Sequence, residues 1–475
     1  MIHSRRPHQI AAVRDVISGF EDHDRGQLIM ACGTGKTLTT RWVVEDMNAR
    51  LTLVLVPSIA LLDQFAAEWR TNASPLHSFE YLCVCSDETL TASMDALEVT
   101  AQDLQADGLS VASDPQTIVD FMLGAGRRVI FSTYQSSHLV ATAQSSIGVP
   151  AFDIVVADEA HKCAAGTSSV FSTVLYQDRI RARKRLFATA TPRIYRRPRK
   201  TGDREQVLAD MGNVGLFGPR FHTLDFRRAI ELGLLCDYQV VVVLSDDEEV
   251  RTVVESSGEK RPAESSEPMM RAAAIGLHKA IEQFELRKVI TFHRSLGNAS
   301  RFRDDLVGVS KSLRRPESCS ASLHVDFLSG AMKANVRRAK LADFRFASPD
   351  TRRVITNARC LTEGVDVPSV DGIAFIDPRS SEIDIVQALG RALRRHEGKI
   401  LGTIVLPIFL GRGDSASDVI QNTDFRAIWN VLSALRSHDD ELASSLVDAR
   451  NAGAGISNSG SDPFAKVHFL VLATC

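Results

Sequence analysis

A short loop near the amino terminus contains the residue types that bind phosphate groups. Residues 30–37 read Met-Ala-Cys-Gly-Thr-Gly-Lys-Thr and lie between a strand-like run, 27–29, and a helix-like run, 38–47. Glycines let backbone N–H groups turn towards phosphate oxygens, Lys36 supplies positive charge, and the Thr37 hydroxyl can ligate Mg²⁺. A methionine stands where the common form of this loop has its first glycine. The loop predicts a nucleotide site; taken alone, it also fits a glycine-rich turn before a helix.

Two adjacent carboxylates follow a buried-strand pattern. The run Ile-Val-Val-Ala at 154–157 leads into Asp158, Glu159 and, two residues later, His161. Ligands of parallel α/β sheets bind at the carboxyl ends of the strands. There Asp158 can hold Mg²⁺ through water, while Glu159 can orient and deprotonate an attacking water. An Asp-Glu pair also suits a solvated surface, and His161 alone suits a packed or capping histidine, but the position directly after an apolar strand favours catalysis.

Two arginines far along the chain can complete such a site. Residues 387–394 read Gln-Ala-Leu-Gly-Arg-Ala-Leu-Arg, so Arg391 and Arg394 are three positions apart and share one face of an expected helix. Arginines aimed at a γ phosphate stabilise transition-state charge and contribute roughly a thousandfold in rate. For them to act with Lys36, two domains must face each other across the nucleotide. The alternative is a basic amphipathic helix with a solvated face.

Alternating strands and helices must position these residues. Apolar, β-branched runs of strand length suit parallel strands that are buried on both faces. They occur at 51–56, 129–132, 154–157, 186–188, 289–292, 354–356 and 373–376. The pattern predicts an α/β chain with two parallel-sheet domains, 1–235 and 236–410, a polar insertion at 245–268, a helical appendage at 411–450 and a flexible tail at 451–475.

The bulk composition sets limits on the class of protein. A chain of 475 residues can bury two cores, since single cores stop growing near about 250 to 300 residues. The formal net charge of −2 gives no overall attraction to nucleic acid. Cys83 and Cys85 have no second pair to complete a zinc site, which favours reduced thiols. Without an apolar run of about 20 residues, we expect a soluble cytoplasmic protein with no membrane partner.

The order of the motifs resembles superfamily 2 helicases and translocases of the DEAD/DEAH-box class, most closely the branch shared with motor subunits of type I and type III restriction enzymes. The resemblance spans about residues 5–410. The segments that carry it are 6–9 (Arg-Pro-His-Gln), 30–37, 56–64, 132–135, 158–161 (Asp-Glu-Ala-His), 189–191 (Thr-Ala-Thr), 291–294, 362–366 and 387–394. It implies two tandem RecA-like P-loop domains with an ATP cleft between them.

The resemblance also implies roles for individual residues. Lys36, Glu159, Arg391 and Arg394 would be catalytic, and Thr37 and Asp158 would hold Mg²⁺. ATP would be bound by Gln9, which would read adenine, and by Gly33, Thr34, Gly35, Lys36, Thr37, Gly364 and Asp366. His161, Thr189, Thr191 and Gln387 would couple hydrolysis to domain movement. A strand-binding groove would contain Pro57, Ser58, Gln64, Thr133, Tyr134, His293 and Arg294, and would grip phosphates without reading sequence.

A basic cluster at residues 179–200 leaves two interpretations open. Charge runs are usually solvated, but a run beside the Thr-Ala-Thr motif can also contact nucleic acid.

We expect an ATP-hydrolysing helicase or translocase that acts on DNA and uses ATP and Mg²⁺. The alternatives are an RNA helicase, because the same core can serve either polymer, and a non-hydrolysing remnant or scaffold of a longer motor. We predict no nuclease activity and no iron–sulfur cluster. We expect a monomeric motor core, with an additional subunit or a missing C-terminal domain left open.

Overall fold

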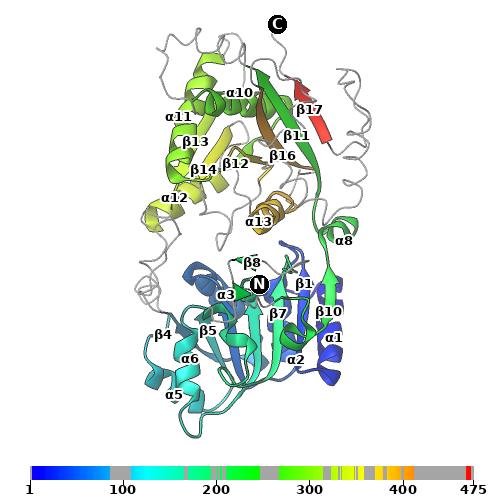
Figure 1. The fold of residues 1–475 in the computed structure, drawn as a ribbon, viewed down its shortest axis with the longest axis vertical. Coiled ribbons are helices and arrows are strands. Elements are labelled where there is room, and N and C mark those ends of the chain that lie inside the picture. Colours follow the sequence, from blue (N-terminus) through cyan, green and yellow to red (C-terminus); the bar gives the residue numbers. More distant parts are fainter. Residues whose placement is uncertain are drawn as a thin grey trace. The chain divides into compact units, whose positions relative to one another are not determined.

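The computed structural model contains two compact units, residues up to Asp225 and residues from Phe226 (Figure 1). It describes residues 3–85, 109–164, 170–193, 200–201, 204–205, 210–246, 267–313, 322–329, 332, 334–346, 348, 351–357, 370–377, 382–396, 399, 401–410 and 467–471. Each unit is built on its own parallel sheet. The predicted fold class, α/β with two tandem parallel-sheet domains, is therefore confirmed. Among the described residues, no helix is both long and apolar enough to cross a membrane.

The first unit has an eight-stranded sheet in the order β10-β1-β7-β6-β2-β5-β3-β4. Its strands are β1 (Arg25–Met30), β2 (Leu51–Val56), β3 (Glu80–Val84), β4 (Val111–Ala112), β5 (Arg128–Thr133), β6 (Phe152–Asp158), β7 (Ala182–Thr189) and β10 (Arg220–Leu224), beside the small antiparallel pair β8 (Lys200–Thr201) and β9 (Arg204–Glu205). Its helices are α1 (Pro7–Asp22), α2 (Lys36–Asp46), α3 (Ile59–Thr71), α5 (Pro115–Leu123), α6 (Ser137–Gln144) and α7 (Val214–Phe217), with 3₁₀ turns η1 (Pro75–His77), η3 (Ala160–Cys163) and η4 (Val170–Leu175).

Helices cover both faces of this sheet, which explains the continuous apolar runs. All six residues of β2 are buried, and successive side chains of a strand point to opposite faces. Its three leucines pack in one core with side chains of α5 and α6. On the other face, Trp69 of α3 lies edge-on to Phe131 of β5, with 5.6 Å between ring centroids. A strand buried on both sides has no polar face to show in the sequence.

The second unit has a seven-stranded sheet in the order β13-β14-β12-β15-β16-β11-β17. Its strands are β11 (Asp237–Asp246), β12 (Lys288–Phe292), β13 (Leu323–Leu328), β14 (Arg352–Asn357), β15 (Gly372–Phe375), β16 (Leu401–Leu410) and β17 (Val467–Val471). Its helices are α8 (Phe226–Glu231), α10 (Glu267–Gln283), α11 (Leu296–Leu313), α12 (Ala334–Arg345) and α13 (Glu382–Ala392). Side chains of α10 and α11 share one core with residues of β11, β12, β14, β15 and β16.

All seven predicted strands are present, but several expected boundaries differ. The units divide before Phe226 rather than after residue 235, because the connection into β11 pairs with the second unit through Leu235 and Arg394. Both ends of the expected polar insertion at 245–268 belong to regular elements, since β11 extends to Asp246 and α10 begins at Glu267; residues 247–266 lie outside the described residues.

The expected C-terminal segments are described only in part. Residues 411–466, which include most of the predicted helical appendage and tail, lie outside the described residues. For Val467–Val471 the expectation of a flexible tail is wrong, because these residues form β17 and pair in parallel with β11.

Candidate nucleotide site

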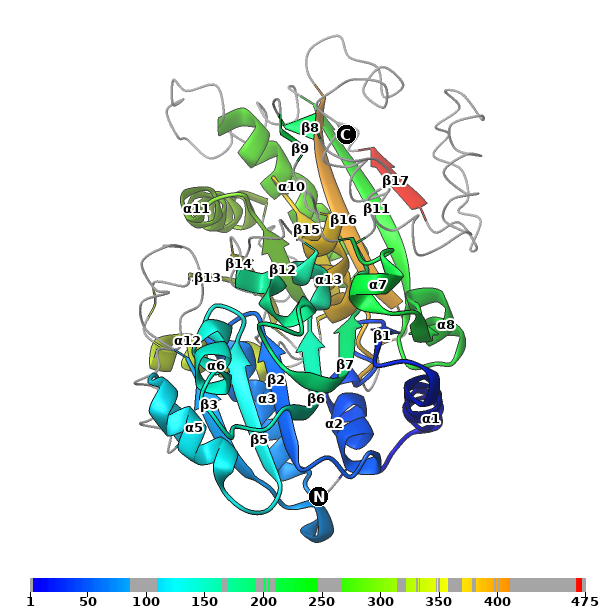
Figure 2. The ribbon, with the colours of Figure 1, turned by 60° about the horizontal axis from the view of Figure 1, so that its bottom comes forward.

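The sheet of the first unit brings three separate motifs to one edge. Strand β7 lies between β1 and β6, and all three run in parallel. Figure 2 shows the arrows of β6 and β7 side by side. Ile29 pairs with Thr189, and Ala188 pairs with Asp158. The loop after β1, Thr189 at the end of β7 and Asp158 at the end of β6 therefore meet where ligands of parallel sheets bind.

The loop after β1 has the backbone that its glycines predict. Gly33 and Gly35 have φ values of 85° and 89°, in the left-handed region that favours glycine. Two consecutive residues of α1 hold the loop: Nε2 of His8 is 2.9 Å from the carbonyl oxygen of Thr34, and the Gln9 amide donates to the Gly35 carbonyl at 3.3 Å. Gln9 is 4% exposed, so the residue expected to read adenine lies directly against the loop.

A side chain at position 35 should disturb this contact. A Cβ added to Gly35 would lie 2.4 Å from Nε2 of Gln9, whereas one added to Gly126, with φ of 86°, would meet nothing within 4 Å. Both Gly35→Ala and Gly126→Ala should lower the free energy of unfolding by about 1–2 kcal/mol, the strain of a left-handed alanine. Only Gly35→Ala should also weaken ATP binding, because Gln9 must move. Urea unfolding and titration with a fluorescent ATP analogue measure the two effects; equal nucleotide affinities would contradict this role of Gln9.

Lys36 is ion-paired with both carboxylates. Its Nζ lies 3.1 Å from Oδ1 of Asp158 and 3.1 Å from Oε1 of Glu159, and all three side chains are largely buried. Burial opposes the charged form of Lys36, but the two carboxylates outweigh it and raise its pKa. Burial also raises the pKa of Asp158 to about 6, while for Glu159 the attraction of Lys36 outweighs burial and lowers the pKa. At neutral pH Glu159 is therefore ionised and able to accept a proton.

The oxygen atoms beside Lys36 suit a hard cation such as Mg²⁺. Apart from the ion pair with Lys36, Oδ1 of Asp158 is buried without a partner in hydrogen-bond geometry, and the Thr37 hydroxyl makes no hydrogen bond to the described residues. Carboxylate and hydroxyl oxygens, together with nucleotide phosphates and water, are the usual ligands of Mg²⁺. The ammonium of Lys36 lies within 3.1 Å of an oxygen of each of the two carboxylates, Asp158 and Glu159.

His161 joins the carboxylates to the Thr-Ala-Thr motif. Its Nδ1 lies 3.0 Å from Oγ1 of Thr189, 3.2 Å from Oγ1 of Thr191 and 3.4 Å from Oε2 of Glu159. Burial lowers the pKa of His161 to about 4, so the ring is neutral at pH 7. A movement of the Glu159 carboxylate can therefore be transmitted to Thr189 and Thr191 through the buried His161 ring.

Glu159 has an uncommon backbone conformation. Its φ of 47° and ψ of 46° are left-handed, although it is not glycine. Such residues are strained by about 1–3 kcal/mol and concentrate at functional sites. The turn aims the Glu159 carboxylate at Lys36 while the next residues form η3.

Tyr134 has a different position from the one expected in a strand-binding groove. Its side chain is fully buried, and its hydroxyl donates to the backbone carbonyl of Asp158 at 2.7 Å. It therefore supports the carboxylate loop and offers no surface to a strand. Pro57 and Thr133 are also buried, whereas Ser58 and Gln64 are partly exposed. The Ser58 hydroxyl accepts a hydrogen bond from the Leu61 N–H and caps α3.

In the second unit, Arg391 and Arg394 do not share a helical face. Helix α13 ends at Ala392, and Arg394 forms an isolated antiparallel bridge with Leu235. The expected common face is wrong because the chain leaves the helix between the two arginines. Gln387 lies in α13 and is 5% exposed. Gly364 and Asp366 lie outside the described residues.

The other two residues expected in the groove differ in exposure. His293 is buried, with Nδ1 3.3 Å from Oδ1 of Asp377, so its side chain offers no surface to a strand; Arg294 is exposed. Burial outweighs Asp377 and lowers the pKa of His293.

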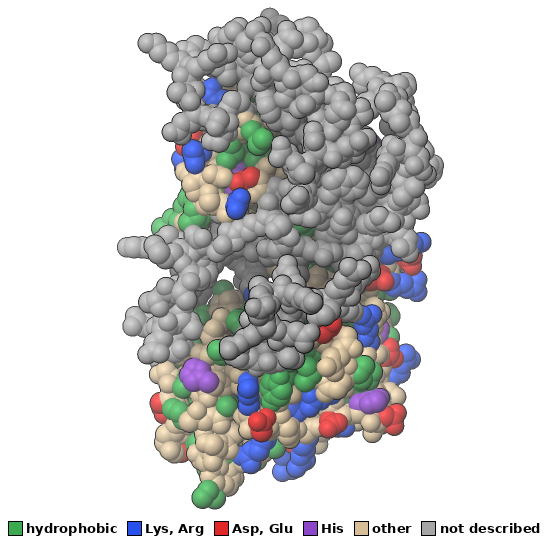
Figure 3. All heavy atoms as spheres, viewed as in Figure 1, with side chains coloured by type: hydrophobic (Ala, Val, Ile, Leu, Met, Phe, Trp, Pro, Cys, Tyr) green, Lys and Arg blue, Asp and Glu red, His purple; other side chains and the backbone are tan. Residues whose placement is uncertain are grey.

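The basic cluster at residues 179–200 is partly structural. Arg181, Lys184 and Arg185 donate to backbone carbonyls of neighbouring segments. They lie at the amino end of β7, at the opposite end of the strand from Thr189. On the face of the first unit in Figure 3, basic and acidic side chains are interspersed. These three residues therefore do not support a nucleic-acid surface.

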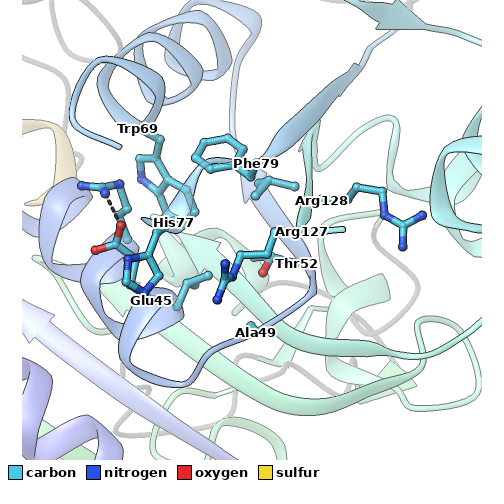
Figure 4. Close-up of a pocket in the computed structure, with 11 residues that line it drawn as sticks. Glu45, Ala49, Thr52, Trp69, His77, Phe79, Arg127 and Arg128 are labelled. Carbon is cyan, nitrogen blue, oxygen red and sulfur yellow. Dashed lines mark hydrogen bonds and ion pairs between the residues drawn. The ribbon is translucent and has the colours of Figure 1, made fainter. Parts of the chain in front are cut away.

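No motif in the sequence singles out Trp69, which contacts the end of the phosphate loop at Thr37. Its indole N–H donates to the Thr37 carbonyl at 3.1 Å. The indole ring borders a cavity of about 20 Å³, which Phe79, His77 and Glu45 also line (Figure 4). The side chain of Arg128 points away from this cavity. A cavity of this size has room for about one water molecule.

Removing this indole N–H should destabilise the protein measurably. Trp69→Phe should lower the free energy of unfolding by about 1 kcal/mol through the lost hydrogen bond and the melting temperature by roughly 2–4 °C. Trp42→Phe is the matched control, because Trp42 is also buried but its N–H makes no hydrogen bond to the described residues. Equal melting temperatures of the two variants would show that the Thr37 contact contributes nothing.

Two family models match parts of this chain. A family model described as "Type III restriction enzyme, res subunit" matches residues 2–194, and one described as "Helicase conserved C-terminal domain" matches residues 277–396. Two probable helicases of African swine fever virus, from Kenyan and Malawian isolates, are each 25% identical over 89% of this chain and 43% of the viral proteins. The chain thus spans less than half the length of these relatives.

Solved structures give the same fold. The chain is similar to the ATP-dependent type ISP restriction-modification enzyme LlaBIII bound to DNA, with a TM-score of 0.80 and 26% identity over 100% of this chain and 32% of that one. A nuclease-deletion mutant of the type ISP enzyme LlaGI, in complex with a DNA substrate mimic, matches 98% of this chain and 30% of its own, with a TM-score of 0.63. At 24% identity the second likeness concerns the fold alone.

Proposed function

Because the chain belongs to helicase superfamily 2, in the branch related to restriction-enzyme motor subunits, we propose that it hydrolyses ATP to move along or remodel DNA. One observation carries the ATPase part of the proposal. Lys36 lies 3.1 Å from each of two carboxylates at the carboxyl edge of a parallel sheet, beside a glycine loop that can cradle phosphates.

The proposed reaction is hydrolysis of the γ phosphate. A bond forms between a water oxygen and phosphorus, the bond to the ADP oxygen breaks, and the proton of the water passes to ionised Glu159. Lys36 leaves its ion pairs to neutralise phosphate charge, and the Gly33 and Gly35 backbone surrounds the phosphates. Bound with the nucleotide by Asp158 and Thr37, Mg²⁺ would neutralise charge on the phosphate oxygens.

We further propose that the second unit contributes Arg391 and Arg394 when ATP is bound. Their guanidinium groups would stabilise the charge of the transferred phosphoryl group, which makes hydrolysis depend on how the units meet. His161, Thr189 and Thr191 support this coupling, since they already form one network with Glu159.

DNA is proposed over RNA as the track because the similar type ISP enzyme LlaBIII is described bound to DNA. A grip on phosphates by Ser58, Gln64 and Arg294 would follow the backbone of a strand without reading its sequence. RNA is the second candidate, because such contacts separate the polymers only by shape and the 2′-hydroxyl.

Steady-state ATP hydrolysis of the full chain should be measured alone and with single-stranded DNA, duplex DNA and RNA. We expect stimulation by DNA that is absent in Lys36→Ala. Stronger stimulation by RNA would replace the proposed track, and no hydrolysis above the Lys36→Ala background under any condition would favour a non-hydrolysing scaffold.

A further inference from the structure

The carboxyl-terminal end of α13 is held by side chains outside the helicase motifs. The last carbonyl groups of a helix have no donor within the helix and carry partial negative charge. Here Arg394 follows the helix end by two residues. The groups that bind the carbonyls of Ala392 and Leu393 therefore also fix the backbone position from which the Arg394 side chain extends.

Lys399 binds one of these carbonyls with a buried ammonium group. It is 8% exposed, and its Nζ donates hydrogen bonds to the carbonyls of Ala392 and Val370. An ammonium at a helix C-terminus is favoured by the helix dipole. Burial lowers the pKa of Lys399, so the fold keeps this charge buried against a desolvation cost. A plain apolar residue would fill the same space without that cost.

The second partner of Lys399 ends another motif. Val370 is fully buried, follows Asp366 by four positions and precedes β15. One ammonium thus joins the end of the segment that carries Gly364 and Asp366 to the end of the helix that carries Arg391. Both segments are expected to line the nucleotide cleft.

The connection from α8 into β11 holds the next two residues. The Cys236 N–H donates to the Leu393 carbonyl at 2.9 Å, and its thiol donates to the same oxygen at 3.3 Å. A guanidinium N–H of Arg395 donates to the Gly233 carbonyl at 2.6 Å. Residues on both sides of Arg394 are therefore fixed, and Lys399 supplies a charged donor to the helix end.

We propose that Lys399 is a positioning residue for Arg394: by bonding the Ala392 and Val370 carbonyls, it sets the helix end from which Arg394 reaches the γ phosphate. The proposal rests on the proposed ATPase function. A misplacement of about 1 Å in such a group lowers a rate by up to roughly a hundredfold. Without the ammonium, the Val370 carbonyl loses this donor, the Ala392 carbonyl is left with the Cys236 thiol at 3.9 Å, and the helix end can fray.

Hydrolysis by Lys399→Met should separate positioning from general stability. We expect kcat to fall by about ten- to a hundredfold, with unchanged affinity for a fluorescent ATP analogue, since Lys36 belongs to the other unit. Lys399→Arg, which keeps the charge, should recover part of the rate. Lys311→Met is the matched control, because Lys311 is an exposed lysine in the last turn of α11.

A double variant decides whether Lys399 acts through Arg394. If it does, Lys399→Met combined with Arg394→Ala should be no slower than Arg394→Ala alone in single-turnover hydrolysis. If instead the rate reductions of the two single variants multiply in the double variant, the proposal is overturned. A melting curve should establish that each variant is folded; if Lys399→Met is not, Lys399→Gln replaces it in the same comparison.

Failure of the ATPase function itself would look different. Wild-type hydrolysis would then equal that of Lys36→Ala, and hydrogen exchange would test Lys399 instead. The amides of Leu393 and Arg394 should exchange faster in Lys399→Met than in Lys311→Met. Equal exchange would overturn the positioning role, whatever the fate of the ATPase proposal.

Discussion

Replacing Lys36 with alanine should reduce ATP hydrolysis by about a hundredfold or more, to the background of the assay. The ammonium is the only cation that the structure describes in ion-pair contact with both Asp158 and Glu159. Its loss removes the charge that would neutralise nucleotide phosphates and leaves two carboxylates to repel them. Binding of a fluorescent ATP analogue should therefore weaken together with hydrolysis. A variant that still hydrolyses ATP at the wild-type rate would remove the basis of the proposed function.

The same substitution should change how stability depends on pH. Breaking a buried ion pair costs about 3–5 kcal/mol, because a carboxylate is left without its partner. The pKa of Asp158 is already raised to about 6 and should rise further without Lys36. A group with a raised folded-state pKa stabilises the fold at low pH and loses that contribution as the pH rises through this value. Urea unfolding of Lys36→Ala should therefore show a larger deficit at pH 8 than at pH 5, with Lys311→Ala as the control.

Replacing Arg394 with alanine should lower the hydrolysis rate by about a thousandfold without weakening ATP binding. Lys36 and its loop belong to the first unit, whereas Arg394 belongs to the second. The loss should therefore fall on the transition state and not on the bound nucleotide. Single-turnover hydrolysis and nucleotide titration measure the two effects separately.

Two further variants make this prediction specific. Arg394→Lys should recover only part of the rate, because lysine keeps the charge but lacks the planar fork of donors. Arg303→Ala removes an arginine of the same unit whose partner is its neighbour Asp304, and it should hydrolyse ATP normally. A wild-type rate in Arg394→Ala would refute the assigned role of Arg394 while leaving that of Lys36 intact.

The phosphate loop and the strands β1, β2, β5, β6, β7, β12, β14 and β15 could be predicted because their signals are local. Parallel strands buried on two faces are continuously apolar, and the loop requires glycines at positions of positive φ. The meeting of Lys36 with Asp158 and Glu159 followed from one rule, that ligands bind at the carboxyl ends of parallel strands. Strand order itself, with β7 between β1 and β6, is not visible in any of these segments.

Other features depend on tertiary contacts that leave no local signal. The residues after Ala392 include good helix formers, yet the chain leaves the helix because Leu235 pairs with Arg394 and Lys399 binds the helix end. Tyr134 was expected in a groove, but its hydroxyl finds a buried carbonyl on a strand that is distant in sequence. Strand β16 contains Pro407, which is tolerated because β15 pairs only with Thr403–Val405.

Strand β17 has a consequence for solubility. It covers the side of β11 that faces away from β16, over the run Val240–Leu244. An uncovered strand with four consecutive valines would present free N–H and C=O groups to any other extended chain, which is how edge-to-edge aggregation begins. Because β17 pairs with β11, the edge of this sheet is a strand of five residues and not the ten-residue β11, and a short edge strand offers fewer free backbone groups to another chain.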